Sequence, residues 1–167
     1  MNTKLVFILS LMIASTILSS CFKNEEYPVE PIITNPTLSL VGDSLLLTFD
    51  FTDGDGDIGL NPNELEAPFD EESYYYYNLY IEYFEKDDVE GWVQGLDAED
   101  DSIVFEYRLK PIIVKGKSRG IKGTIEVYMQ PYYNAASAQS DTVKYQITLI
   151  DKALNESNPL ETGEIYP

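Results

Sequence analysis

The chain has 167 residues and a formal net charge of −18, from 11 basic and 29 acidic side chains, and it contains no histidine. An acidic surface repels phosphate backbones, so we expect no nucleic-acid partner. The lack of histidine excludes Ser-His-Asp triads and histidine-ligated zinc sites. The length and a hydrophobic fraction of 44% predict one globular domain with its own core.

The first 21 residues have the pattern of a lipoprotein signal. Lys4 precedes an apolar run over Leu5–Leu18, which is too short to span a bilayer comfortably and is typical of a secretory signal peptide. The run leads into the motif Leu-Ser-Ser-Cys, which ends at Cys21, the single cysteine. This motif resembles the lipobox of bacterial lipoproteins. The resemblance implies cleavage before Cys21, diacylglycerol on its thiol and acylation of the new amino group.

These features predict three segments. Residues 1–20 are expected to be the signal peptide, residues 21–36 a lipidated tether and residues 37–167 the folded domain. The tether is expected because Pro28, Pro31 and Pro36 fall in a stretch without hydrophobic periodicity. Several acyl chains hold a protein stably at a membrane, so we expect a cell-envelope protein that is lipid-anchored to the outer membrane. The alternative is an ordinary signal peptide that ends near a cysteine.

From Thr37 onward the hydrophobic pattern is that of β-strands. Leu45, Leu47, Phe49 and Phe51 alternate with other residues, which predicts a half-buried strand. Further segments of alternating or β-branched character predict strands at Tyr74–Glu85, Trp92–Val93, Ser102–Leu109, Ile121–Gln130, Thr142–Ile150 and Glu161–Tyr166. About seven short strands separated by turns predict an all-β fold, an antiparallel immunoglobulin-like β-sandwich.

One loop contains three aspartates at alternate positions. In Asp-Gly-Asp-Gly-Asp-Ile-Gly, which we name the acidic loop (residues 53–59), Asp53, Asp55 and Asp57 lack basic neighbours. Their mutual repulsion would be relieved by a hard divalent cation such as Ca²⁺, which prefers six to eight oxygen ligands. The spacing resembles that of the helix–loop–helix calcium loop, with Glu64 in the twelfth place, but Ile58 stands where that loop requires glycine. A plain Asp-Gly turn is the alternative.

A second loop has residues suited to the same cation. Residues 151–157, the closing loop, resemble the Asp-x-Ala-x-Asn-x-Ser loop of many bacterial immunoglobulin-like modules. In such a sandwich the loops that follow the second and sixth strands lie at the same end. Asp151 and Asn155 are therefore expected to complete the metal shell of the acidic loop. The alternative is that these two side chains cap their own turn by hydrogen bonds to the backbone.

Taken together, these motifs resemble one protein family. The lipobox, the tether, the segment Phe49–Gly59, the Ile-Lys-Gly motif at Ile121–Gly123 and the closing loop are similar to those of uncharacterised bacterial envelope lipoproteins with an immunoglobulin-like β-sandwich. The resemblance covers roughly Phe49–Ser157. It implies fold and location, and it carries no catalytic residues.

We therefore expect a non-enzymatic, lipid-anchored module for binding or assembly, with a protein or glycan as partner. A glycan-capturing accessory lipoprotein is the alternative if Tyr74, Tyr76 and Tyr80 are exposed beside a groove, because tyrosine rings stack on sugars. Otherwise these rings serve packing. A hydrolase is the third candidate. It needs a cleft with two carboxylates about 5–9.5 Å apart and a raised pKa.

The lipid anchor yields the first prediction. Cys21→Ala removes the thiol that would carry diacylglycerol, so an uncut or soluble precursor is expected. Metabolic labelling with a fatty-acid probe should label the wild-type chain and not the variant. Label retained on the variant would contradict the lipoprotein assignment.

Overall fold

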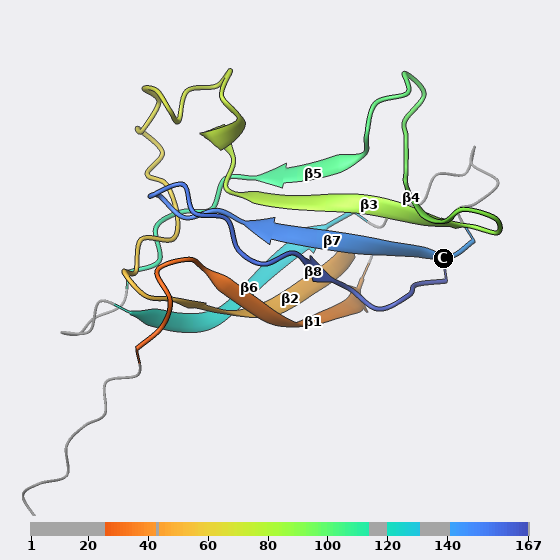
Figure 1. Ribbon diagram of the computed structural model, residues 1–167, viewed down its shortest axis with the longest axis horizontal. Coiled ribbons are helices and arrows are strands. Elements are labelled where there is room, and N and C mark those ends of the chain that lie inside the picture. Colours follow the sequence, from red (N-terminus) through yellow and green to blue (C-terminus); the bar gives the residue numbers. More distant parts are fainter. Residues whose placement is uncertain (1–25, 43, 114–119, 131–140, 167) are drawn as a thin grey trace, which may run out of the picture.

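The computed structural model describes residues 26–42, 44–113, 120–130 and 141–166. These residues form two antiparallel sheets that face each other as layers (Figure 1). No α-helix occurs among them, which confirms the predicted all-β class. The strands are β1 (Ile32–Val41), β2 (Ser44–Asp53), β3 (Leu79–Asp87), β4 (Gly91–Gln94), β5 (Val104–Tyr107), β6 (Ile121–Met129), β7 (Val143–Leu149) and β8 (Leu160–Glu161).

The strand order is that of an immunoglobulin-like sandwich. The first sheet has the order β1-β2-β6, and the second has β4-β3-β7-β8 with β5 also paired to β3. Strand β5 pairs with the first half of β3 and β4 with its second half, so the two strands lie one after the other along the same edge of β3. The groups β1-β2-β6 and β3-β7-β8 correspond to the A-B-E and C-F-G strands of the immunoglobulin fold. The predicted β-sandwich is thus confirmed, with eight strands instead of about seven.

The core forms where the two sheets meet, and it follows from period-two alternation. On β2 the side chains of Leu47, Phe49 and Phe51 point inward, and on β7 those of Tyr145 and Ile147 do the same. All five are at most 3% exposed. Successive strand residues point to opposite faces, so every second residue of these strands lies in the core.

The first strand begins earlier than expected, and the predicted tether is correspondingly too long. Strand β1 starts at Ile32 and pairs with the end of β2, and Ile33 is fully buried. A register shift between Thr34 and Thr37 accommodates Asn35, which has a φ of 55°, and the following proline. Prolines are tolerated on edge strands and at bulges. The proline content of this segment therefore indicated a linker where an irregular edge strand exists.

The predicted strand over Tyr74–Glu85 is also partly wrong. Tyr74–Tyr76 form a short 3-10 helix, and β3 begins only at Leu79. The Oγ of Ser73 accepts a hydrogen bond from the Tyr75 N–H at 3.1 Å, and the Ser73 carbonyl accepts one from Tyr76. A serine-capped turn thus overrides the β-propensity of consecutive aromatic residues.

The C-terminal strand is likewise shorter than predicted. Leu160 and Glu161 form β8, and the expected strand up to Tyr166 is reduced to an isolated bridge between Ile165 and Val143. The segment still closes the sandwich, because β8 pairs with β7 and lies next to β1.

A pair of variants tests the assignment of the core. Phe49 is fully buried in β2, so Phe49→Ala should lower the free energy of unfolding by about 3–5 kcal/mol. Tyr128 on β6 is 60% exposed, and Tyr128→Ala should change it by less than about 0.5 kcal/mol. Urea unfolding of both variants measures the difference. Equal losses would contradict the described packing.

Candidate metal centre

The alternation that builds the core also carries two aspartates into it. Asp53 is the last residue of β2 and continues the inward-facing series of that strand. Asp151 follows β7 in phase with Tyr145, Ile147 and Leu149. Asp53 is fully buried and Asp151 is 2% exposed. Because β2 and β7 belong to different sheets and end on the same side, the two carboxylates meet between the layers.

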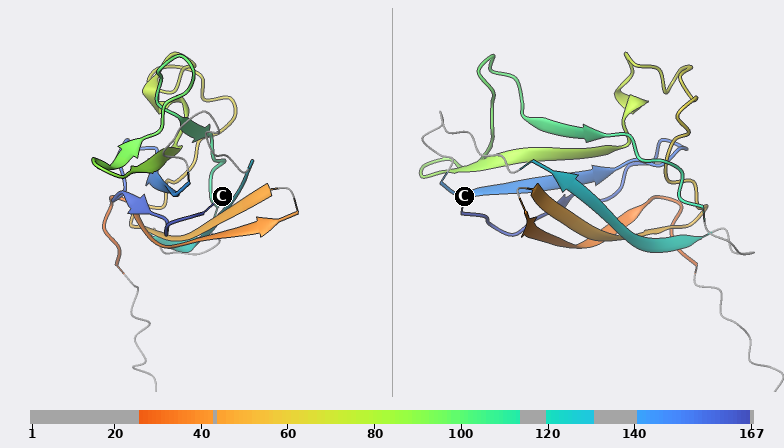
Figure 2. Two further views of the ribbon diagram at one scale, coloured as in Figure 1. Left: turned by 90° about the vertical axis from the view of Figure 1, so that its right-hand side faces the viewer. Right: turned by 180° about the vertical axis from the view of Figure 1, so that it is seen from behind.

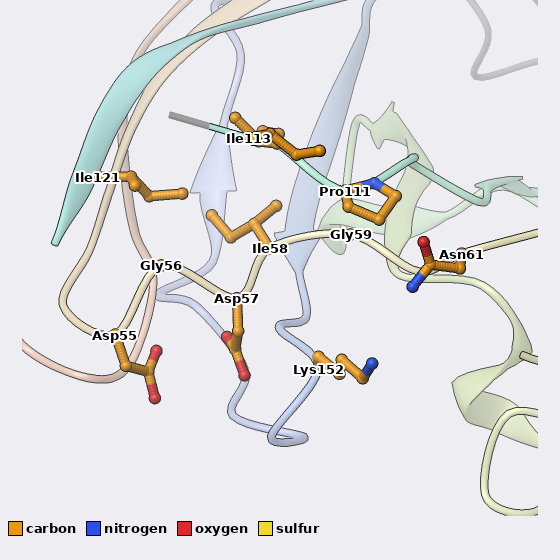
Figure 3. A pocket seen from close by; sticks show the side chains of 11 residues that line it. Asp55, Gly56, Asp57, Ile58, Gly59, Asn61, Pro111, Ile113, Ile121 and Lys152 are labelled. Carbon is orange, nitrogen blue, oxygen red and sulfur yellow. The ribbon is translucent and has the colours of Figure 1, made fainter. Parts of the chain in front are cut away.

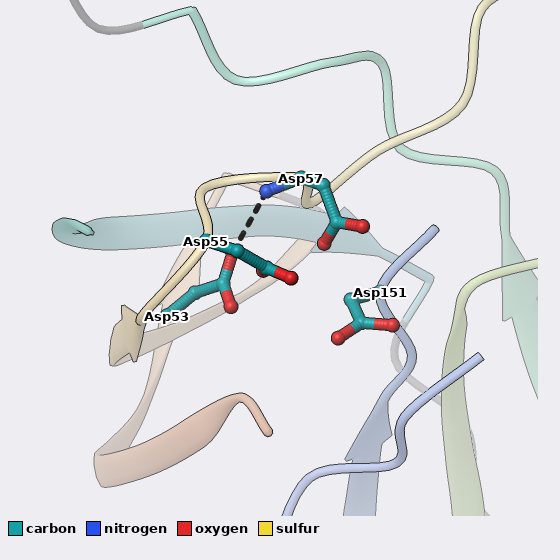
Figure 4. A group of neighbouring side chains, drawn as sticks. All are labelled: Asp53, Asp55, Asp57 and Asp151. Carbon is teal, nitrogen blue, oxygen red and sulfur yellow. Dashed lines mark hydrogen bonds between the residues drawn. The ribbon is translucent and has the colours of Figure 1, made fainter. Parts of the chain in front are cut away.

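The acidic loop adds two further carboxylates to this pair. Asp53, Asp55, Asp57 and Asp151 each offer one carboxylate oxygen, and these oxygens lie within 4.8 Å of one another. Figure 4 shows the side chains from the acidic loop and Asp151 turned toward a common centre. Asp55 is exposed, whereas the other three are buried or half-buried. The structure therefore has an acidic cluster, defined by these four residues, with one side open to solvent.

Hydrogen bonding leaves part of the cluster unsatisfied. The Asp57 N–H donates to Asp53 Oδ2 at 2.9 Å, which closes the turn of the acidic loop (Figure 4). The other oxygen of Asp53 and Oδ1 of Asp57 are buried without a hydrogen-bond partner. Among the described residues, no Lys or Arg forms an ion pair with any of the four carboxylates. Buried anionic oxygens without partners are costly unless a cation or a proton compensates them.

The electrostatics of the cluster reflect this burial. Burial raises the pKa of Asp53 to about 6, against the opposing hydrogen bond from Asp57 and with added repulsion from the neighbouring carboxylates. Burial and the charge of Asp151 raise the pKa of Asp57 to about 6. Burial also raises the pKa of Asp151, although hydrogen bonds from Asn155 oppose this. The cluster therefore favours the uptake of positive charge, as protons or as a metal ion.

Neighbouring segments fix the acidic loop in place. The Lys152 N–H donates to the Asp57 carbonyl at 3.3 Å, which joins the acidic loop to the closing loop. On the other side, Ile112 donates to the Ile58 carbonyl at 3.0 Å. Gly59 has a φ of 101°, and a Cβ atom there would collide with the backbone of Lys110. This glycine is required both by its conformation and by the close approach of that chain segment.

Asn155 supports Asp151 in the structure. Its side-chain amide donates to Asp151 Oδ2 at 2.8 Å, and its backbone N–H donates to Asp151 Oδ1 at 2.7 Å. The Asp151 N–H in turn donates to the Asn155 carbonyl. The turn-capping alternative thus describes Asp151, whose Oδ1 accepts from the Asn155 backbone N–H, and Asp151 also belongs to the acidic cluster. The Asn155 side chain bonds the Asp151 carboxylate instead of the backbone. Direct metal ligation by Asn155 stays a prediction.

Glu64 does not take the place that the calcium-loop spacing suggests. One of its carboxylate oxygens is paired with Lys152 Nζ, and the other accepts from the Asn61 N–H at 2.8 Å. These bonds, led by that from Lys152, lower the pKa of Glu64 to about 2. The helix–loop–helix geometry is absent from the described flanks, so Glu64 serves the loop that follows the acidic loop.

A cavity of about 350 Å³ adjoins the cluster (Figure 3). Asp55, Asp57, Asn61 and Lys152 contribute its polar lining, and apolar side chains such as Ile58 line the remainder. Asp53 does not line this cavity. The buried side of the cluster is therefore separate from the cavity, and the exposed side borders it.

The tyrosines do not present the surface that the glycan alternative requires. Tyr80 is only 7% exposed, and its ring stacks on that of Tyr74 with centroids 4.8 Å apart. Tyr76 lies against the guanidinium of Arg108 at 4.7 Å. None of the three lines either of the two cavities described for the molecule. Packing accounts for Tyr80 and Tyr76, whereas Tyr74 is 53% exposed but borders neither cavity, so a glycan partner stays a prediction.

The raised pKa values predict how stability depends on pH without metal. Folded Asp53 and Asp57 have pKa values of about 6, above the ordinary 3.8. Between about pH 4 and pH 6 the folded state therefore binds more protons than the unfolded state, and the stability from these groups falls as pH rises. Asp57→Asn removes one of them. In chelator, the free energy of unfolding of this variant minus that of wild type should increase from pH 4 to pH 7.

Urea unfolding at each pH measures this difference. Taking the difference cancels the carboxylates elsewhere in the chain, such as Glu164, whose pKa is lowered by Lys86. A flat or decreasing difference would show that Asp57 is not a buried titrating group.

The predicted lipidation site, Cys21, and the predicted signal peptide lie outside the described residues. Within the described residues, no helix has the length and apolar character needed to cross a membrane. Comparison of the chain with models of known protein families, with curated protein sequences and with solved structures finds no match.

Proposed function

We propose that the chain is a non-enzymatic, lipid-anchored module of the cell envelope whose sandwich binds Ca²⁺ at the acidic cluster. The observation that carries the metal part is the convergence of four carboxylates around buried oxygens without partners. The lipobox-like motif that ends at Cys21 supports the anchor and the outer-membrane location. The role is binding or assembly, with a protein or glycan partner.

The chemistry of the ligands favours Ca²⁺ over other metals. A purely carboxylate cluster suits the hard cations, because softer metals prefer nitrogen or sulfur ligands. Mg²⁺ demands near-ideal octahedral geometry and usually binds through only one or two carboxylates, while Ca²⁺ accepts six to eight oxygens in flexible arrangements. Four converging carboxylates on two loops match the second description better.

A cation at this place would connect the two sheets. Asp53 ends a strand of one sheet, and Asp151 follows a strand of the other. An ion bound between them joins the layers where apolar packing gives way to carboxylates. We therefore assign the metal a stabilising role, in which it shapes the loop end of the module for contact with a partner.

The geometry gives less support to hydrolysis by a carboxylate pair. One oxygen from each of the four carboxylates lies within 4.8 Å of the others, an arrangement suited to sharing a single ion. The raised pKa of Asp53 meets one requirement of an acid catalyst. Its side chain, however, is fully buried and does not line the neighbouring cavity, so a substrate in that cavity does not reach it.

Calcium binding should raise thermal stability. An ion that binds only the folded state at a hundredfold excess over Kd adds about 2.7 kcal/mol. For a chain of this size, about 1 kcal/mol shifts Tm by roughly 2–4 °C. We therefore expect wild type to melt several degrees higher in Ca²⁺ than in chelator, and less of a shift in Mg²⁺ at matched ionic strength. Asp55→Asn combined with Asp57→Asn should abolish the calcium-specific part.

A matched variant controls for the general relief of negative charge. Asp100→Asn combined with Asp101→Asn removes two charges from an exposed loop, so it should retain the full calcium shift. Equal shifts in wild type with both ions would contradict a calcium site. So would a calcium shift that survives in the variant of the acidic loop.

A further inference from the structure

The residues that enter the sandwich pack on the acidic loop. Part of the predicted tether, residues 26–31, is named the N-terminal segment here. A Cβ atom on Gly54 would collide with the carbonyl oxygens of Tyr27 and Pro28, the latter at 2.5 Å. A Cβ atom on Gly120 would lie 3.1 Å from the Tyr27 ring and 3.5 Å from the Asp53 carbonyl. Two glycines thus form a cradle for this segment directly against the acidic cluster.

The fold places this cradle at the end of the molecule that contains the acidic cluster. Figures 1 and 2 show the N-terminal segment approaching the end of the sandwich where β2 and β7 terminate. Gly54 lies between Asp53 and Asp55 in the acidic loop. The segment and the cation would therefore both contact the same few residues of the acidic loop.

We propose that cation binding at the acidic cluster and docking of the N-terminal segment are coupled. The metal would then control the junction between the sandwich and the chain that precedes it. This inference rests on the proposed cation site, whose independent support is the fully buried Asp53 with one oxygen lacking a partner. The N-terminal segment is then the element whose conformation the cation regulates.

The coupling follows from repulsion inside the acidic loop. Without a cation, crowded carboxylates push Asp53, Asp55 and Asp57 apart, and the backbone of Gly54 moves with them. The carbonyls of Tyr27 and Pro28 then lose their close contact with Gly54. With a cation, the loop is held in the docked conformation. Linkage is reciprocal, so a docked segment must tighten cation binding by the same factor as the cation favours docking.

Hydrogen exchange and calcium titration of the full chain in detergent micelles test this coupling. In wild type, Ca²⁺ should slow amide exchange of residues 26–31 relative to chelator at matched ionic strength. Gly54→Ala keeps every carboxylate but prevents docking. Its segment should exchange rapidly with or without Ca²⁺, and its Kd for Ca²⁺ should rise about fivefold or more. Asp55→Asn combined with Asp57→Asn should remove the effect of Ca²⁺ on the segment.

Two further variants keep the result interpretable. Gly163→Ala is the matched control, because a Cβ atom there meets nothing within 4 Å, and it should behave as wild type. Tyr27→Ala removes the ring that lies near Gly120 and changes no residue of the acidic loop. It should weaken docking and Ca²⁺ affinity, so it tests the coupling even if Gly54→Ala fails to fold. Slow exchange of the β7 amides would show that a variant is folded.

The outcomes separate the coupling from the metal site itself. Ca²⁺ binding to wild type without any change in exchange of residues 26–31 would overturn the coupling and leave the cation site standing. A fast-exchanging segment in Gly54→Ala or Tyr27→Ala with an unchanged Kd would do the same. No Ca²⁺ binding to wild type would overturn the proposed site and the coupling together.

Discussion

Burial of acidic groups at one end of the core is the constraint on which this structure depends. The sandwich is made by strands that turn every second residue inward, and on β2 and β7 the inward series ends in aspartate instead of an apolar residue. A buried carboxylate must find hydrogen bonds, a proton or a cation. The fold supplies a few hydrogen bonds, from the Asp57 N–H to Asp53 and from Asn155 to Asp151. Within the acidic cluster, one buried oxygen of Asp53 and one of Asp57 remain without a hydrogen-bond partner.

Three other parts of the chain contact the acidic loop in the folded structure. The closing loop, the segment around Ile112 and the N-terminal segment each approach its backbone from a different part of the chain. Glycine is needed at Gly59 and Gly54, because other chain segments pass where a side chain would stand. These contacts oppose the separation of the crowded carboxylates, and a bound cation would relieve the repulsion that remains. This preorganisation separates the cluster from the many acidic residues elsewhere on the surface.

Local chemistry and tertiary packing disagreed at two places. The prolines near the start of the domain predicted a tether, yet β1 already pairs with β2 from Ile32 by means of a bulge. The run of tyrosines predicted a strand, yet a serine cap forms a turn and Arg108 packs against Tyr76. Strand pairing in the first case, and a serine cap together with the Arg108 contact in the second, outweighed the average preference of the residue types.

The all-β class, the main strands and the acidic loop could be predicted without the structure, because alternation with period two is a local property of the backbone. In the structure the same alternation continues past Phe51 and Leu149, which places Asp53 and Asp151 on the inward faces. Only the tertiary structure decided that these faces meet, that Asp57 joins them and that Glu64 pairs with Lys152 instead. These facts depend on how two sheets pack and where their strands end, which no local pattern encodes. Docking of the N-terminal segment on Gly54 is likewise a contact between segments distant in sequence, and it emerged only from the folded chain.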